Sequence, residues 1–190
     1  MARSSLRRLA NTLAFFVLVA GFLLVLLLPR VPPQPAPEEA ETLSGVVSYV
    51  YDGDTLEVVG VGKVRVIGID ALDGHNAERM LSQSRSYGLT TRQVEHWARE
   101  ATALAGGLLQ GREAVLHLGP TRQDDYGRTL AYVHVATDAG DQDFGLLMLD
   151  RGLTATYRNA THPRQEQYLA AERLAQAARK GMWQDARVRP

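Results

Sequence analysis

The 190-residue sequence contains no cysteine, which excludes a disulfide framework, a thiolate metal site and a cysteine nucleophile. The five histidines (His75, His96, His117, His134 and His162) lack the spacing of zinc ligands. Lysine is scarce: 19 of the 21 basic residues are arginine, whose planar guanidinium suits bidentate contacts with phosphate or carboxylate groups. A hydrophobic share of 45% excludes a wholly disordered chain.

The N-terminal segment has the composition of a membrane-directed sequence. Three arginines precede an apolar run at 9–28, and twenty helical residues span about 30 Å, the thickness of a bilayer core. The run ends in Pro29-Arg30 without a small-residue cleavage motif, which favours an uncleaved anchor over 1–30. Basic residues ahead of the run predict a single-pass protein of the cell membrane, with its domain outside the cytoplasm. A removed signal peptide, giving a secreted or periplasmic protein, is the alternative.

The composition changes again after the apolar run. Residues 31–42 (VPPQPAPEEAET) are proline-rich and acidic, which is typical of a semi-extended linker. One folded domain is expected at 43–185, followed by a short tail at 186–190. Residues 1–42 hold four Arg and three Glu, so the remainder has 17 basic and 18 acidic residues. A net charge of −1 gives no large positive field, and any nucleic-acid binding must be local.

The folded part begins with a period of two and continues with helical spacing. Three β-branched runs separated by turn sequences predict an antiparallel meander at 46–50, 55–59 and 64–69. A polar, aperiodic stretch at 74–90 precedes apolar residues at helical spacing over 94–108. Two further strands are expected at 114–118 and 129–136, and two helices at 144–151 and 165–179, the last with Tyr168, Leu174 and Ala175 among its partial core contacts. This order predicts an α+β fold compatible with an OB-type barrel.

Four clusters could carry chemistry: Tyr51-Asp52-Gly53-Asp54-Thr55, Arg65 with Asp70, Asp73, and Asp124-Asp125-Tyr126-Gly127-Arg128. Each alone has a structural explanation as a hairpin turn, a paired strand arginine or a capping aspartate. In combination, Asp54 and Asp70 offer the hard oxygen ligands that Ca²⁺ accepts, and Arg65 and Arg128 offer planar donors for a phosphate. Two acids, a metal and two arginines suit attack on a phosphodiester.

One geometric condition applies to this grouping. Arg65 and Asp70 have opposite parity along the predicted strand at 64–69, so their side chains point to opposite faces. They can share a site only if the chain leaves the ladder or bulges near residues 68–70.

The motifs DGDT, KVRVIGID, DDYGRTLAYVHV and LDRGL, and a C-terminal helix ending in GMW, occur in this order between residues 44 and 183. In this order they resemble the thermonuclease family, the staphylococcal-nuclease-like domains. The resemblance implies a five-stranded OB-type barrel packed against about three helices. It also implies a Ca²⁺-dependent endonuclease that cleaves single-stranded or frayed DNA and RNA and leaves 3′-phosphate ends. No obligate protein partner is evident.

The resemblance also assigns roles to individual positions. Asp54 and Asp70 match the calcium-binding aspartates, with Asp52 supporting them, and Ala71 replaces a threonine whose main-chain carbonyl is the ligand.

The substrate-facing positions match as well. Arg65 and Arg128 match the arginines that stabilise charge on the phosphorus. Tyr126 matches a tyrosine near a terminal phosphate, and Tyr157 matches one that stacks on a base, with a core or surface role as the alternative.

The sequence departs from the family where the general base is expected. Members commonly read D-[TA]-P-E, whereas this chain reads Asp70-Ala71-Leu72-Asp73. Asp73 therefore replaces the glutamate that orients or deprotonates the attacking water, and its carboxylate lies about 1.5 Å nearer the backbone. A misplacement of about 1 Å can cost on the order of 10²-fold in rate, so reduced activity is expected.

A second departure concerns local charge. Asp125 stands where a basic residue is common, which removes attraction for phosphate. Arg79, Arg85 and Arg92 either compensate for this loss or form a solvated face. Two non-enzymatic alternatives remain: a nucleic-acid- or protein-binding module, and a structural envelope protein. Binding modules of this kind typically lose the aspartates and arginines that this chain retains.

Overall fold

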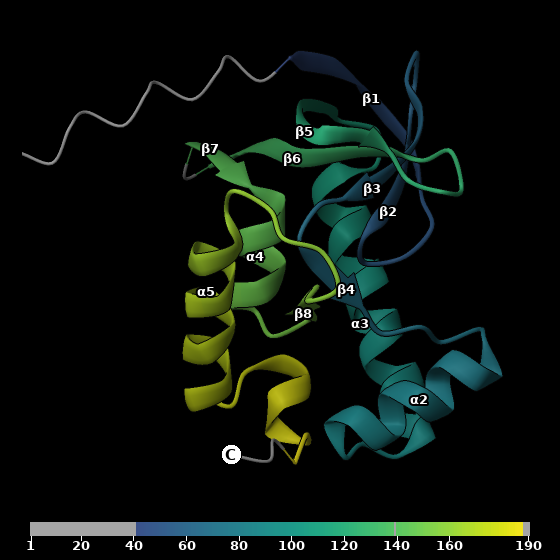
Figure 1. Ribbon diagram of the computed structural model, residues 1–190, viewed down its shortest axis with the longest axis vertical. Helices are drawn as coiled ribbons and strands as arrows, with labels where there is room; N and C mark the ends of the chain where they lie inside the picture. The colour runs from purple at the N-terminus through teal and green to yellow at the C-terminus, as the bar shows by residue number, and fades with distance from the viewer. Residues whose placement is uncertain (1–40, 139, 188–190) are drawn as a thin grey trace, which may run out of the picture. The chain divides into compact units, whose positions relative to one another are not determined.

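The computed structural model describes residues 41–138 and 140–187. Five strands form a closed barrel: β1 (Thr42–Val50), β2 (Thr55–Val58), β3 (Gly62–Val66), β5 (Glu113–Gln123) and β6 (Thr129–Thr137). Their order is β3-β2-β1-β5-β6, and parallel pairing between β3 and β6 closes the ring (Figure 1). Alternating side chains fill its interior, and Val47, Leu56, Val64, Leu116 and Val133 are fully buried. The predicted meander and five-stranded barrel are confirmed.

The predicted third strand does not run to residue 69 as one element. β3 ends at Val66, and the chain turns through Gly68 (φ 82°) into β4 (Ile69–Ala71), which pairs with β8 (Thr154–Thr156) in a separate two-stranded sheet. Only glycine fits this turn, because an added Cβ would lie 2.5 Å from the His162 ring and φ is in the left-handed region. The departure from the ladder required for Arg65 and Asp70 to meet is confirmed.

The polar stretch at 74–90 contains a helix, α2 (Ala77–Tyr87), which hydrophobic periodicity does not predict. Its Asn76 side chain caps the first turn by accepting from the Arg79 amide, and Gly88 ends it in the left-handed conformation. Among its residues only Gln83 is buried. A helix with such a polar surface shows no apolar stripe in the sequence, so the prediction of an irregular segment is wrong.

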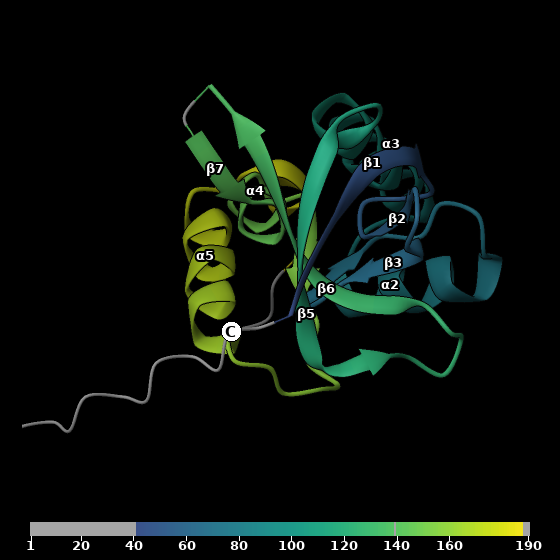
Figure 2. The same cartoon turned by 90° about the horizontal axis from the view of Figure 1, so that it is seen from above.

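The second helix, α3 (Thr91–Leu109), is the amphipathic one predicted from residues 94–108. Thr90 and Gln93 form a capping box at its start. Its buried face contains Val94, Trp97 and Ala101, and the chain turns away at Gly111 (φ 77°). This helix packs against β1 and α2 on one side of the barrel (Figure 2).

The C-terminal half adds β7 (Gly140–Asp143), which extends the sheet beside β6, then α4 (Phe144–Asp150), α5 (Gln165–Ala177) and a short 3₁₀ helix, η1 (Gly181–Gln184). The described residues thus contain four α-helices, one more than the number expected from the family. On α5 the buried residues are Tyr168, Glu172 and Ala175, while Leu174 is 67% exposed, so its predicted core contact is wrong. Arg158 compensates the buried Glu172 with a 2.7 Å ion pair, which allows a carboxylate to occupy that face.

The predicted anchor at 1–30 and the linker up to residue 40 lie outside the described residues. In the described part of the chain, no helix combines the length and apolar character needed to cross a bilayer. β1 begins at Thr42 and η1 ends at Gln184, close to the expected limits of the folded domain.

Candidate active site

The Asp-Gly-Asp sequence forms a tight turn between β1 and β2. The Tyr51 amide donates to the Thr55 carbonyl at 2.9 Å, and the Asp54 amide donates to Asp52 Oδ1 at 2.9 Å. Gly53 does not adopt a positive φ. It is required because an added Cβ would lie 2.9 Å from Ala101 Cβ and 3.0 Å from Ala71 Cβ. The glycine therefore lets the acidic turn pack closely against α3 and β4.

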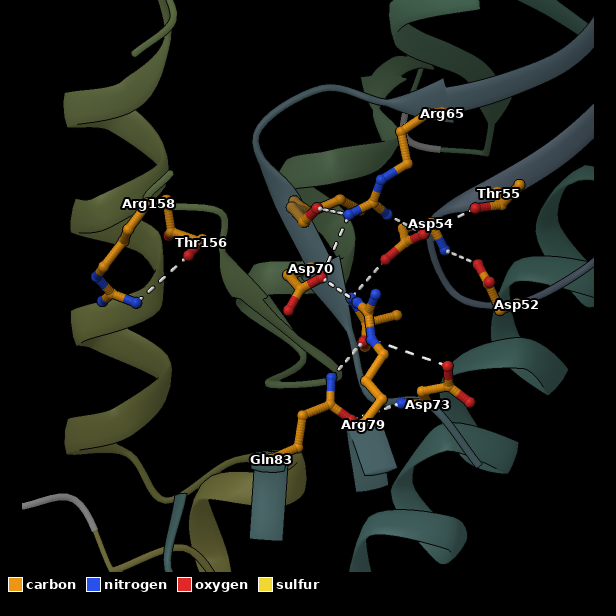
Figure 3. Close-up of polar contacts among 12 residues, drawn as sticks. Asp52, Asp54, Thr55, Arg65, Asp70, Asp73, Arg79, Gln83, Thr156 and Arg158 are labelled. Atoms are coloured by element: carbon orange, nitrogen blue, oxygen red, sulfur yellow. Dashed lines mark hydrogen bonds and ion pairs between the residues drawn. The ribbon is translucent and has the colours of Figure 1, made fainter. Parts of the chain in front are cut away.

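Asp54 is 4% exposed, and a buried carboxylate must be compensated by donors. Its Oδ1 accepts from the Thr55 hydroxyl at 2.9 Å, and its Oδ2 accepts from the Ala71 amide at 2.6 Å. Arg65 Nη1 contacts the same carboxylate. Asp54 therefore joins the barrel to β4 (Figure 3).

Arg65 brings the two predicted metal-binding aspartates together. Besides Asp54, its guanidinium contacts Asp70 Oδ1 at 3.3 Å and donates to the Ile69 carbonyl at 3.0 Å. Burial lowers the pKa of Arg65, and the charge of Asp70 opposes that shift. Because one guanidinium touches both carboxylates, Asp54 and Asp70 lie within a few ångströms of a common point.

A second arginine, Arg79 of α2, contacts Asp70 and Asp73. Its Nη2 donates to Asp70 Oδ1 at 2.6 Å, and its Nε lies 3.8 Å from Asp73 Oδ2 (Figure 3). The arrangement gives Arg79 a defined partner, whereas Arg85 and Arg92 are exposed. On the sequence alone, Arg79 is named only together with Arg85 and Arg92, as arginines that could compensate for Asp125. No feature of the sequence indicated that Arg79, rather than the other two, faces the site.

The Asp73 side chain accepts hydrogen bonds from the backbone of the turn that follows it. Its Oδ1 accepts from the His75 amide at 2.8 Å and from the Asn76 amide at 2.9 Å, which is the local turn that aspartates favour before a helix. Its Oδ2 points toward Arg79. One of the two oxygens of the predicted base is therefore committed to the backbone at the start of α2.

Gln83 of α2, which sequence reasoning missed, fixes the loop between Asp70 and Asp73. Its amide nitrogen donates to the Ala71 carbonyl at 3.1 Å, and its amide oxygen accepts from the Asp73 amide at 2.8 Å. The Ala71 carbonyl, predicted as a metal ligand, thus already accepts one hydrogen bond, from Gln83. No local pattern in the sequence identifies Gln83.

Arg128 is oriented by Asp124. Its Nε and Nη2 both lie 2.7 Å from Asp124 Oδ2, and the other carboxylate oxygen accepts from the Tyr126 and Arg128 amides. Burial opposes ionisation of Asp124, but the hydrogen bonds and charge of Arg128 lower its pKa. Arg128 Nη1 lies 3.5 Å from the Thr55 hydroxyl, which joins this loop to Asp54. In the sequence, the four-residue spacing of Asp124 and Arg128 across Gly127 is the signal that could have identified this ion pair.

The two predicted substrate-binding tyrosines each lie beside one of these arginines. The Arg65 guanidinium is 6.0 Å from the Tyr157 ring centroid, and the Arg128 guanidinium is 5.4 Å from that of Tyr126. Tyr126 is 85% exposed, and Tyr157 is half-buried with its amide bonded to the Gly68 carbonyl.

A cavity of about 460 Å³ opens over this cluster, lined by Tyr51, Asp52, Thr55, Lys63, Arg79, Tyr126 and Arg128. Burial raises the pKa of Asp52 at its edge, against the opposing charges of Arg65 and Arg128. Of the predicted site residues, Asp52, Tyr126 and Arg128 line this cavity. The others are linked to them through Asp54, Thr55, Arg79 and Gln83, except Tyr157, whose ring centroid lies 6.0 Å from the Arg65 guanidinium.

Comparison with known proteins identifies the family. A sequence profile described as "Staphylococcal nuclease homologue" matches residues 63–185. The chain belongs to this family.

The curated proteins that match this chain are only distantly similar to it. "Probable endonuclease lcl3" of Pyrenophora tritici-repentis is 28% identical over 161 residues, which is 75% of this chain and 59% of the relative. "Probable endonuclease LCL3" of Leptosphaeria maculans is 32% identical over 108 residues, covering 52% of this chain and 36% of the relative. "Uncharacterized protein MJ1439" of Methanocaldococcus jannaschii is 26% identical over 147 residues, 73% of this chain and 70% of the relative. The chain thus spans 36–59% of the length of these two endonuclease-named relatives.

The candidate active site carries a formal excess of negative charge. Four carboxylates (Asp54, Asp70, Asp73 and Asp124) contact three guanidinium groups (Arg65, Arg79 and Arg128), and Asp52 accepts from the Asp54 amide. With Lys63, which lines the same cavity, five acidic groups stand against four cations, a formal excess of one negative charge. Among the residues that the structure describes, no group of three or more His, Cys, Asp or Glu side chains is arranged to hold a metal ion. A cation here would depend on two carboxylates supplemented by carbonyl and water oxygens.

Proposed function

We propose that the protein is a Ca²⁺-dependent phosphodiesterase that hydrolyses single-stranded or frayed DNA and RNA. The observation that carries the proposal is the convergence of Asp54 and Asp70 on the Arg65 guanidinium. Family membership supports the same conclusion. Two acids beside two arginines and an open cavity provide what phosphoryl chemistry requires: a cation site, donors for the developing charge and room for the strand.

The donor set fits calcium. Asp54, Asp70 and the Ala71 carbonyl would hold the ion, and all three supply hard oxygen ligands in an irregular arrangement. The formal excess of negative charge in the cluster favours a cation there. When bound, calcium supplies Lewis-acid stabilisation of charge on a phosphate oxygen.

We assign phosphate binding to Arg65 and Arg128. Arg128 is held on one side by Asp124 and lines the cavity, so its remaining donors can meet a phosphate oxygen. Arg65 contacts both aspartates and is not itself among the residues that line the cavity. As a water attacks in line, both guanidinium groups would stabilise the growing equatorial charge while the bond to the 5′ oxygen breaks, leaving a 3′-phosphate end.

The attacking water would lose its proton to Asp73. Only Oδ2 is available for this role, because Oδ1 accepts from two backbone amides. A shortened side chain with one engaged oxygen is a weak base for this geometry, so turnover should be slow for the family.

The test is digestion of single-stranded DNA and RNA by the full-length protein, with Ca²⁺ and with EGTA. Asp54→Ala should abolish calcium-dependent cleavage. Asp150→Ala is the matched control, since it removes an exposed aspartate that does not line the cavity. End-group analysis should find 3′-phosphates. Equal cleavage by Asp54→Ala and wild type, or cleavage in EGTA, would contradict the proposal.

Because one oxygen of Asp73, the proposed base, already accepts from two backbone amides, a second candidate function is favoured. It is a nucleic-acid-binding module with little or no catalysis. Such a module would bind single strands through Arg128 and the tyrosines without cutting them. The same experiment separates the two functions, because a module retains the oligonucleotide intact with Ca²⁺ present.

We also propose that residues 1–30 anchor the protein in the membrane, with its domain outside the cytoplasm. The proposal rests on the apolar run at 9–28 and the arginines before it. Membrane fractionation followed by alkaline carbonate extraction tests it: an anchored protein stays in the pellet, whereas a cleaved one is found in the soluble fraction.

A further inference from the structure

Two side chains that the proposed reaction does not use line the cavity, and a third packs on one of them. Tyr51 and Lys63 line it together with Arg79 and Arg128, and Tyr49 packs on Tyr51. Both tyrosines are unusually accessible, with Tyr49 53% and Tyr51 39% exposed. Exposed aromatic rings beside a cationic cavity require an explanation, because burial in the core does not account for them.

The strand register extends one surface from Arg65 to these residues. Tyr49 of β1 pairs with Glu57 of β2, and Glu57 pairs with Lys63 of β3, so the three are cross-strand neighbours on one face. Lys63 lies two residues before Arg65 on β3, hence on the same side of the strand and about 7 Å away. The surface from Arg65 to Tyr49 is therefore continuous with the candidate active site.

The contacts among these residues hold the rings in place. The Tyr49 and Tyr51 centroids are 5.0 Å apart in an edge-to-face arrangement, and Lys63 Nζ lies 4.1 Å from the Tyr51 centroid. The Tyr51 hydroxyl donates to Glu57 Oε2 at 3.0 Å. Cross-strand packing alone would explain a tyrosine pair on a sheet. It does not explain why one ring and its lysine form part of the cavity wall beside Arg128.

We propose that Tyr49, Tyr51 and Lys63 form a subsite for one nucleotide of the strand next to the scissile phosphate. An unpaired base stacks on one tyrosine ring, the other ring being packed edge-to-face against it, and Lys63 meets the adjoining backbone phosphate. The Glu57 carboxylate accepts from the Tyr51 hydroxyl, and its negative charge repels a phosphate at that position. The tyrosine rings are therefore assigned to the base and not to the backbone. Stacking needs a splayed, unpaired base and is tolerant of its identity, so the subsite selects single strands without reading sequence. The proposal rests on the proposed function.

The test measures binding apart from cleavage. Fluorescence anisotropy in EGTA compares full-length wild type with variants, using labelled dT8 and an eight-unit abasic strand of the same charge. Tyr51→Ala and Tyr49→Ala should each weaken dT8 binding about 5- to 100-fold and leave binding of the abasic strand unchanged. Tyr51→Phe keeps the ring and should bind dT8 as wild type does. Lys63→Met should weaken both strands and reduce the salt slope by about one.

Val59→Ala is the matched control, because Val59 is exposed on the same hairpin and does not line the cavity. If both alanine variants bind dT8 as tightly as wild type does, the subsite is overturned. If wild type then still cleaves in a Ca²⁺-dependent way, the proposed function stands. Tyrosine-dependent binding of dT8 without any cleavage in Ca²⁺ supports the subsite and overturns the nuclease. A wild type that does not bind either strand overturns the subsite. Thermal unfolding of each variant separates loss of binding from loss of the fold.

Discussion

Arg79 of helix α2 donates to Asp70 Oδ1 at 2.6 Å, the same oxygen that Arg65 of the barrel contacts at 3.3 Å. One aspartate is thus shared by a buried arginine that is part of the fold and by a half-exposed arginine on a peripheral helix. The two arginines have different consequences when removed, because only Arg65 also compensates a buried carboxylate.

Arg79→Ala should increase calcium affinity. In the structure Arg79 competes as a cation for Asp70, and at 47% side-chain exposure that ion pair is worth only about 0–1 kcal/mol. We therefore expect a modest gain of about 2- to 5-fold in the calcium association constant, measured by isothermal titration calorimetry. Arg85→Ala, on the same helix and exposed, should leave affinity unchanged. Weaker calcium binding in Arg79→Ala would mean that Arg79 positions Asp70 rather than competing for it.

Arg65→Ala should destabilise the fold as well as abolish activity. Asp54 would keep its burial and lose its charge partner, which costs about 3–5 kcal/mol for an ion pair inside a protein. Urea unfolding in EGTA measures this loss. Calcium should restore part of it, because a divalent cation can replace the missing guanidinium.

Arg65→Lys provides the comparison. It keeps the charge beside Asp54 but cannot span Asp54, Asp70 and the Ile69 carbonyl with one planar group. Stability should fall less than in Arg65→Ala, while the cleavage rate should still drop about 10²- to 10³-fold. A lysine variant with wild-type turnover would exclude a specific role for the guanidinium.

Asp73→Glu should raise the cleavage rate and lower stability. The longer side chain extends the carboxylate by about 1.5 Å toward the cavity, which is worth about 10- to 100-fold in rate if reach is limiting. It also gives up the hydrogen bonds from the His75 and Asn76 amides that begin α2, at a cost of about 1 kcal/mol.

Asp73→Ala provides the comparison, since both variants lose the turn and only Asp73→Glu keeps a carboxylate. Single-turnover cleavage with saturating Ca²⁺ and urea unfolding should be measured on the same preparations. A glutamate variant slower than wild type would show that the turn at Asp73 matters more for the site than the reach of its carboxylate.

The barrel and the acidic turn could be predicted from the sequence because their signals are local. Period-two strands identify the meander, and the parity conflict between Arg65 and Asp70 identifies the bend at Gly68 before any coordinates are known. At this bend a side chain on residue 68 would clash with His162, 94 positions further along the chain. The sequence pattern states the condition for a bend but does not reveal this neighbour.

The missing parts of the site come from α2 and from pairings between distant segments. α2 has one buried residue, Gln83, so its sequence has no apolar stripe to detect. Arg79 and Gln83 reach Asp70 and Ala71 only because this polar helix folds back over β4. β4 and β8 have three residues each, too few for a periodic signal, and they pair across more than 80 positions.

Alkaline solution should destabilise the protein through buried tyrosines, independently of the site's chemistry. Burial raises the pKa of Tyr87 to about 12, and the negative charges of Asp70 and Glu172 add to the shift. Between pH 10 and 12 the unfolded chain has lost this proton while the folded chain keeps it. The folded state therefore binds more protons, and the free energy of unfolding falls as pH rises through this window.

Tyr87→Phe tests the contribution of this single hydroxyl. It should make the decline in unfolding free energy between pH 10 and 12 shallower by about one proton, or about 1.4 kcal/mol per pH unit at most. Burial and Asp143 also raise the pKa of Tyr168, so part of the alkaline decline should remain in the variant. Tyr126→Phe changes a residue that is 85% exposed, and the unfolding free energy of this variant should decline as that of wild type does. An unchanged slope in Tyr87→Phe would mean that Tyr87 ionises alike in the folded and unfolded chains, and that its packing against Trp183 does not exclude water from the hydroxyl.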